Sequence, residues 1–229
     1  MTIGILQCGA APAELLPEHG PYGAMVQRLL GPNRDTRVFD VTAGALPASP
    51  AACSAYVLTG SPAGVYEDLP WIAPLLGFLR QARGQAKLAG ICFGHQAMAQ
   101  AFGGNVVKSP KGWGIGLQRY DVVQHAPWMD GAPHVDVPAS HQDQVVALPP
   151  GARVVAANAF TPFAGLDYGD AISFQFHPEF TPAFGVALIE GRRDRYEPLA
   201  GAAIASYAQA NDCARVSGWI NRFLDAPSL

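Results

Sequence analysis

Apolar and polar positions alternate in two different ways along the first hundred residues of the chain. Short apolar runs of the kind typical of buried strands occupy residues 3–7, 55–62 and 86–92, and residues 36–41 alternate like a strand. Between and after them, apolar residues recur with the spacing of a helix in residues 22–31, 69–83 and 95–104. Strands that alternate with helices in this way predict a parallel sheet with helices on both faces.

The pattern changes after residue 105. Strand-like runs separated by Gly, Pro, Asn and Asp occupy residues 114–123, 145–149, 153–158, 163–168 and 171–176. Helical spacing returns in residues 181–193 and 200–225. We therefore expect a three-layer, flavodoxin-like α/β fold, with a mostly parallel central sheet and a small antiparallel extension from roughly 105–170. We expect one domain over residues 1–229, with its core at about 3–190 and a C-terminal helical segment at 181–229.

The charge of the chain indicates which kinds of macromolecule it could bind. The 229 residues carry a formal net charge of -3, and 14% of them are charged. The densest basic group, Arg192, Arg193 and Arg195, is interleaved with acidic residues, so we interpret it as a solvated helix end. Because no larger cluster of Lys and Arg exists, we expect no nucleic-acid partner.

The cysteines and the apolar runs bear on the compartment. Cys8, Cys53, Cys92 and Cys213 are widely spaced and form no CxxC pair, which argues against a disulfide framework or a zinc site. No apolar run reaches the ~18 residues needed to span a bilayer. The first residues also lack the basic region of a secretion signal. We expect a cytoplasmic protein with no membrane partner.

One of these cysteines lies at a tight turn in the stretch AGICFGHQAMAQAFGG. Cys92 stands between Gly90 and Gly94, at the point where an apolar run passes directly into a helical one. Such a turn holds its central side chain above the sheet edge, beside a helix N-terminus. The N–H groups there favour a thiolate and stabilise a developing oxyanion. Cys92 is therefore a candidate nucleophile, although the turn alone is equally compatible with a small buried cysteine.

A candidate base follows in the stretch AISFQFHPEF. His177 stands at the end of a strand-like run, and Glu179 is near enough in sequence to orient its imidazole. The carboxyl ends of parallel strands meet at one edge of a sheet, so we expect His177 and Cys92 to share a crevice. His95, in contrast, starts a helix, and we expect it to point away from Cys92.

Together these motifs resemble the class I glutamine amidotransferase family, the type with a Cys-His-Glu triad. GICFGHQ and FQFHPEF match its two diagnostic motifs in order. LTGSPAGVYED (58–68) resembles the loop that completes the oxyanion hole, and SHQDQV (140–145) resembles a segment beside the glutamine pocket. The resemblance covers roughly residues 3–190, and it is greater for free-standing, GMP-synthase-like members than for fused ones.

The resemblance implies a role for each matching position. Cys92 is the expected nucleophile, His177 the expected base, and Glu179 the residue that orients His177. The backbone N–H groups of Gly60 and Phe93 are expected to form the oxyanion hole. The residues expected to line the substrate pocket are Gln96, Ser140, His141, Gln142 and Asp143.

Two positions depart from the pattern of many relatives. Ser61 stands in the oxyanion loop where many synthetase-linked members carry glycine, and Gln142 stands where several relatives have glycine. Both side chains are expected to reshape the γ-glutamyl pocket.

Three functions are compatible with these residues. The first is a glutaminase-type amidotransferase that forms a γ-glutamyl thioester on Cys92 and passes ammonia to a separate synthase subunit. The second is a stand-alone γ-glutamyl peptidase or hydrolase that uses the same chemistry. The third is a non-catalytic redox sensor, in which Glu14 or Glu18 lies against Cys92. A thiolate, an imidazole and N–H donors suffice for the first two, so we expect no metal and no organic cofactor.

Overall fold

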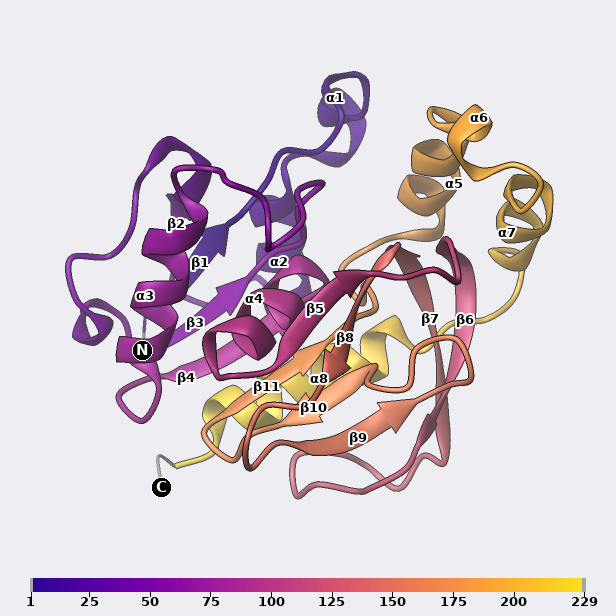
Figure 1. Ribbon diagram of the computed structural model, residues 1–229. Helices are drawn as coiled ribbons and strands as arrows, with labels where there is room; N and C mark the ends of the chain where they lie inside the picture. The colour runs from indigo at the N-terminus through magenta and orange to yellow at the C-terminus, as the bar shows by residue number, and fades with distance from the viewer. Residues whose placement is uncertain (1, 228–229) are drawn as a thin grey trace.

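The computed structural model describes residues 2–227, and its main feature is a nine-stranded mixed sheet (Figure 1). Its parallel part contains, in spatial order, β2 (Thr36–Asp40), β1 (Ile3–Gln7), β3 (Ala55–Leu58), β4 (Lys87–Ile91) and β11 (Ala171–Phe174). The antiparallel part continues the same sheet through β10 (Gly165–Asp167), β9 (Arg153–Ala157), β6 (Gly114–Val122) and β7 (His134–His141). A separate two-stranded sheet pairs β5 (Asn105–Lys108) with β8 (Asp143–Ala147). The predicted parallel core with an antiparallel extension is confirmed.

Helices cover both faces of the parallel strands. One face packs against α2 (Tyr22–Leu30) and α8 (Cys213–Asp225), and the other against α3 (Ile72–Ala82) and α4 (Phe93–Ala101). Strand β3 shows why both covers are needed, because Val57 is buried against the first pair and Leu58 against the second. Successive side chains of a strand point to opposite faces, so a continuously apolar strand must be covered on both sides.

The main difference from the predicted elements is β7, which the residue pattern did not indicate as a strand. Pro138 interrupts its alternation, and proline is uncommon within strands because it lacks an N–H donor. Here the strand lies at the edge of the sheet, where a missing donor interrupts no second ladder. The carbonyl of Pro138 accepts a hydrogen bond of 2.8 Å from the backbone N–H of His177. The unpredicted strand therefore helps to hold the candidate base.

The C-terminal helical pattern is also divided. The expected run 200–225 contains two helices, α7 (Ala200–Ser206) and α8, with Asp212 in the break. The N–H of Asp212 donates to the carbonyl of Asp136 at 2.8 Å, and its carboxylate accepts from the Asp136 N–H at 2.9 Å. These bonds hold the chain to β7, and α8 begins directly after them.

Short helices complete the structure. They are α1 (Leu16–His19), α5 (Pro182–Glu190) and α6 (Arg193–Tyr196), with 3-10 turns at Ala13–Leu15, Val41–Ala43 and Pro50–Ala52. Helices α5, α6 and α7 form a C-terminal arm (residues 182–206) that lies beside the ends of β6 and β7 (Figure 1). The arm is attached there by a hydrogen bond of 2.8 Å from the Leu117 N–H to Ser206 Oγ. Among the described residues, no helix is both long enough and apolar enough to cross a membrane.

Candidate active site

Cys92 occupies a strained turn between β4 and α4. Its backbone has φ 51° and ψ −101°, and no other residue except glycine has a positive φ in the part of the chain that the structure describes. The turn requires small neighbours: a Cβ at Gly90 would lie 2.6 Å from the backbone of Gly94, and a Cβ at Gly94 would lie 2.6 Å from Leu58 Cβ. Strain of this kind persists where the surrounding structure imposes it, commonly at functional sites.

The predicted base lies beyond the neighbouring strand. His177 follows the end of β11, which pairs with β4, so the histidine and Cys92 leave the sheet at the same edge. Its Nδ1 is 2.7 Å from Glu179 Oε1, and its ring stacks on Phe180 with the centroids 4.0 Å apart. His177 and Glu179 are both buried. With Nδ1 bonded to Glu179, Nε2 is the ring nitrogen that remains for the sulfur of Cys92.

The electrostatics of the pair favour a charged imidazolium. Burial lowers the pKa of His177, but the charge of Glu179, together with the charge of Cys92 and its hydrogen bond to the ring, raises that pKa to about 10. A buried positive charge is stable here because two acidic partners face it. The arrangement places a charged imidazolium between the Glu179 carboxylate and the Cys92 sulfur.

The loop after β3 completes the arrangement. Gly60 lies against both side chains, because a Cβ at this position would be 3.0 Å from His177 Cε1 and 3.7 Å from Cys92 Cβ. Phe93 is the first residue of α4, where an N–H has no acceptor within the helix. Neither the Gly60 N–H nor the Phe93 N–H donates a hydrogen bond within residues 2–227. Two donors beside the sulfur could stabilise an oxyanion.

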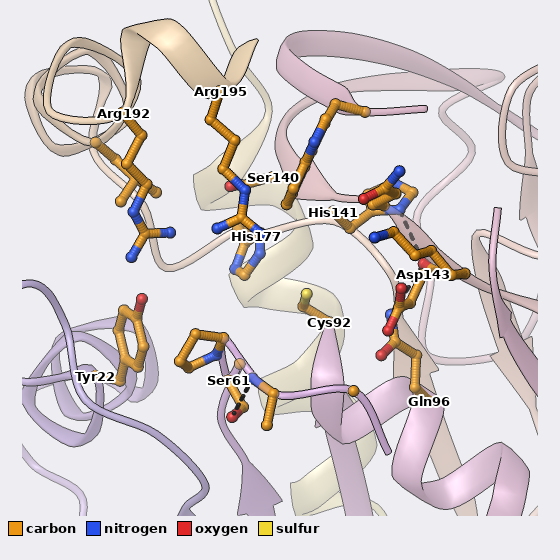
Figure 2. Close-up of a pocket in the computed structure, with 18 of the residues that line it drawn as sticks. Tyr22, Ser61, Cys92, Gln96, Ser140, His141, Asp143, His177, Arg192 and Arg195 are labelled. Carbon is orange, nitrogen blue, oxygen red and sulfur yellow. Dashed lines mark hydrogen bonds between the residues drawn. The ribbon is translucent and has the colours of Figure 1, made fainter. Parts of the chain in front are cut away.

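A cavity of about 150 Å³ opens over Cys92 (Figure 2). An engineered cavity of ~150 Å³ accommodates a molecule the size of benzene, so this space suits a small acyl group. The sequence-predicted residues that line it are Gly60, Cys92, Gln96, Ser140, His141, Gln142, Asp143 and His177. The structure therefore brings these positions together, with Glu179 directly behind His177 and Phe93 at the start of α4.

Several of these lining residues are held in place by their neighbours. Gln96 Nε2 donates to the Asp143 carbonyl at 3.0 Å, and the Asp143 carboxylate is hydrogen-bonded to Tyr66. Burial lowers the pKa of His141 to about 4, so its imidazole binds a proton too weakly to act as an effective second base at pH 7. Ser61 Oγ accepts from the Ala63 N–H at 3.1 Å, so this departure from the family pattern braces the oxyanion loop.

Sequence reasoning assigned no role to Gln175, which is fully buried beside Cys92. Its Nε2 donates to Cys92 Sγ at 3.6 Å, and its Oε1 accepts from Gln96 Nε2 at 3.1 Å. Gln96 thereby sets the orientation of the amide that faces the sulfur. The sequence did contain an indication of this role. Gln175 is a polar residue within an apolar run and lies two positions before His177, so in an extended chain both side chains point to the same side.

Gln175→Glu tests this contact. The substitution preserves the length of the side chain but replaces an N–H donor by a carboxylate oxygen, which disfavours a thiolate nearby. We expect alkylation of Cys92 by iodoacetamide at pH 7 to slow about tenfold or more, the effect of losing a hydrogen bond to a charged group. Peptide mapping of the labelled cysteine measures the rate. Gln81→Glu, at an exposed position on α3, is the matched control and should react like the unmodified protein.

Three interpretations of individual residues have definite outcomes. His95 points away from Cys92 as predicted, with Nδ1 2.8 Å from Ser173 Oγ. Glu14 and Glu18 are exposed on the segment around α1 and do not line the cavity, so the glutamate contact of the sensor hypothesis does not form. The basic group lies at a short helix as predicted, with Arg193 and Arg195 exposed, but Arg192 and Arg195 also line the cavity, which the sequence did not indicate.

The described residues contain no group of three His, Cys, Asp or Glu side chains placed to hold a metal ion. The other cysteines differ from Cys92 in their surroundings. Burial raises the pKa of Cys8 far above its usual range and that of Cys213 to about 12. Cys53 is buried at the start of β3 and its pKa is also raised by burial.

Solved structures share the whole fold. A glutamine amidotransferase of Thermotoga maritima superimposes with a TM-score of 0.79 over 98% of this chain and 99% of its own, at 20% identity. A glutamine amidotransferase of Methylobacillus flagellatus gives a TM-score of 0.78 over 97% and 93% of the two chains, at 23% identity. At this level of identity, the comparison establishes the fold.

Sequence comparison places the chain more narrowly. A glutamine amidotransferase-like protein of Schizosaccharomyces pombe is 27% identical over 78% of this chain and 79% of its own length. The glutamine-hydrolysing GMP synthase of Aromatoleum aromaticum is 36% identical over 55% of this chain, and γ-glutamyl peptidase 4 of Arabidopsis thaliana is 31% identical over 55%. These alignments span 25% of the synthase and 53% of the peptidase. The model of the family described as glutamine amidotransferase class-I matches residues 24–189, more than half of the chain, which therefore belongs to that family.

Proposed function

We propose that this protein hydrolyses the side-chain amide of glutamine through a γ-glutamyl thioester on Cys92. The Cys92 thiolate attacks the amide carbon, and the N–H groups of Gly60 and Phe93 hold the charge that develops on the carbonyl oxygen. The carbon–nitrogen bond breaks as the imidazolium of His177 gives its proton to the departing amine. Water, deprotonated by the now neutral His177, then attacks the thioester, the carbon–sulfur bond breaks, and glutamate leaves.

One observation carries this proposal. Cys92 in its strained turn, His177 bonded to Glu179, and Gly60 line one small cavity, and Phe93 directly follows Cys92 at the start of α4; within residues 2–227 the N–H groups of Gly60 and Phe93 donate no hydrogen bond. A redox sensor would require a reactive thiol alone, whereas acyl transfer requires the nucleophile, the base and the oxyanion donors together. The complete set therefore favours an enzyme.

The fate of the ammonia is part of the proposal. In the glutamine-hydrolysing GMP synthases, the region similar to this chain is about a quarter of the protein. This relationship supports delivery of the ammonia to a synthase. We propose such an acceptor for this chain, in an assembly that the isolated protein does not need for hydrolysis itself.

A second candidate is hydrolysis of γ-glutamyl peptides by the same thioester chemistry. It is supported by the similarity to γ-glutamyl peptidases 3 and 4 of Arabidopsis thaliana, each 31% identical. The two candidates share the acyl half of the substrate and differ in the departing amine. Steady-state turnover of glutamine and of γ-glutamyl dipeptides by the purified chain distinguishes them, with Cys92→Ala as the blank. Turnover of neither substrate class would contradict both candidates.

Gly60→Ala tests the oxyanion loop. The added methyl group would lie 3.0 Å from His177 Cε1, too close unless the ring or the loop moves. We expect kcat for glutamine to fall about tenfold to a hundredfold, because small displacements of catalytic groups are costly. Gly77→Ala, on α3 where a methyl group meets nothing within 4 Å, is the matched control and should retain the rate. Equal rates in both variants would contradict the assigned position of Gly60.

A further inference from the structure

We propose that Arg192 and Arg195 form a subsite for an anionic group on the departing amine. The inference rests on the thioester chemistry proposed above and specifies its substrate: a γ-glutamyl amide whose amine carries a carboxylate. Both arginines belong to the basic group at the C-terminal arm, Arg192 directly before α6 and Arg195 within it. Both line the cavity that contains Cys92 and His177 (Figure 2).

The two arginines lack the partners that surface arginines usually have. Arg193, between them in sequence, forms ion pairs with Glu190 at 2.8 Å and Glu197 at 3.3 Å. Within residues 2–227, no carboxylate oxygen lies within 4.0 Å of a side-chain nitrogen of Arg192 or Arg195. The single residue of the group that faces away from the cavity is thus the one that is neutralised. The positive charges of Arg192 and Arg195 therefore remain available to bind an anionic ligand in the cavity.

Arg195 is held in an orientation that suits recognition. Its guanidinium lies 4.6 Å from the ring centroid of Trp113, which in turn packs edge-on against Tyr196 with the centroids 5.1 Å apart. Stacking on an aromatic face restrains the guanidinium plane and leaves its N–H edge available. Less side-chain entropy is then lost when an anion binds.

The arginines lie on the side of the cavity where the amine must depart. Tyr22 connects Arg192 to the base: the charge of Arg192 acts on the Tyr22 hydroxyl, and the Tyr22 ring packs on Phe180, which stacks on His177. Because His177 protonates the departing amine, that amine lies beside its ring. Figure 2 shows Arg192 and Arg195 on this side, and Gln96 and Asp143 on the other side of Cys92.

The opposite side of the cavity is acidic, and its charges suit the other half of the substrate. Glu67, Asp143 and Lys108 all line the cavity; burial raises the pKa of Asp143, and its hydrogen bond to Tyr66 and the charge of Lys108 oppose that rise. An α-ammonium group of the γ-glutamyl moiety complements this acidic side. The cavity is therefore polarised along the scissile bond, with carboxylates toward the acyl group and arginines toward the amine.

Glutamine alone does not use this polarity, because its departing group is ammonia and carries no anion. An amine that bears a carboxylate, as in a γ-glutamyl amino acid, provides one, and a guanidinium binds it with two parallel hydrogen bonds. A phosphonate offers similar oxygens with a different shape and charge. The preferred occupant is the carboxylate, since a flat, two-oxygen group matches the stacked, planar Arg195.

The test compares γ-glutamylglycine with γ-glutamylglycinamide, which differ only in the carboxylate of the amine. The wild-type chain should prefer γ-glutamylglycine, and the ratio of the two kcat/KM values should fall about tenfold to a hundredfold in R192Q/R195Q, mainly through KM. R193Q is the matched control and should keep the wild-type ratio. γ-Glutamyl-aminomethylphosphonate is the third substrate, expected to be hydrolysed less well than γ-glutamylglycine.

Each other outcome is informative. An unchanged ratio in R192Q/R195Q, whether or not the two rates fall together, would overturn the subsite while leaving the thioester mechanism intact. Equal losses would place the arginines on the α-carboxylate of the acyl group instead. Faster hydrolysis of γ-glutamyl-aminomethylphosphonate than of γ-glutamylglycine would overturn the carboxylate as the preferred ligand of the two arginines and favour a phosphonate-like group. Failure of the wild-type chain to hydrolyse any γ-glutamyl amide would overturn the proposed function and the subsite with it.

Discussion

Cys92→Ala is expected to lower kcat for glutamine hydrolysis by about 10⁴-fold or more, the loss typical of removing a nucleophile from a triad. Without the sulfur, no thioester forms, and the N–H donors of Gly60 and Phe93 have no covalent intermediate to stabilise. Ammonia release from the purified protein measures the effect. A residual rate within tenfold of wild type would show that another group carries the chemistry.

The matched control for this substitution is Cys53→Ala. Cys53 is also buried, but it lies at the start of β3, at the opposite end of that strand from Gly60. Its replacement should leave kcat unchanged. Because alanine at position 92 must still adopt a positive φ, the Cys92→Ala protein retains the backbone strain of the turn. Its loss of activity therefore reports the sulfur and not a relaxed loop.

His177→Ala should produce a loss of similar size, about 10⁴-fold in kcat. The imidazole stabilises the Cys92 thiolate in the first step, protonates the departing amine, and activates water in the second. His125→Ala, at an exposed position, is the control. The variant also separates the enzyme from the sensor hypothesis. If the protein is a sensor, peroxide should still oxidise Cys92 in His177→Ala. If it is an enzyme, the variant should no longer form a thioester.

The same pair of residues determines the pH dependence. Burial lowers the pKa of His177, yet Glu179 and Cys92 raise it to about 10, above the usual value of 6.5. The imidazolium is therefore present below that pH and lost as pH rises through it, so kcat/KM should decline near pH 10. Glu179→Gln removes the largest influence that raises this pKa. The alkaline decline should move to lower pH in that variant, and an unmoved decline would contradict the assigned role of Glu179.

The strands and helices of the parallel core could be predicted because each carries its own signal. Fully apolar runs such as β3 require two covered faces, and the glycines around Cys92 indicate a turn that only small residues permit. The shared edge of β4 and β11 followed from the same pattern, since Cys92 directly follows β4 and His177 comes three residues after the end of β11. Local sequence therefore sufficed for the parallel core and for the expectation that Cys92 and His177 leave the sheet at the same edge.

The features that sequence did not predict depend on contacts between distant segments. Strand β7 could not be predicted because it contains Pro138. A proline is tolerated there only because the strand lies at the edge of the sheet, and the sequence does not show that position. Arg192 and Arg195 looked like Arg193 in a charged run, and only the packing of the C-terminal arm beside β6 and β7 turns two of the three toward the cavity. Gln175 acquires its contact with sulfur through Gln96, a residue of another element.

Labelling by a chloroketone analogue of glutamine tests most directly whether Cys92 and His177 act together. The mass of the intact protein, followed by peptide mapping, shows which cysteine reacts. We expect a single adduct per chain, located on Cys92, suppressed by excess glutamine and absent from His177→Ala. An adduct on Cys8, Cys53 or Cys213 in place of Cys92, or equal labelling of Cys92 with and without His177, would contradict the claim that these two residues form one γ-glutamyl transfer site.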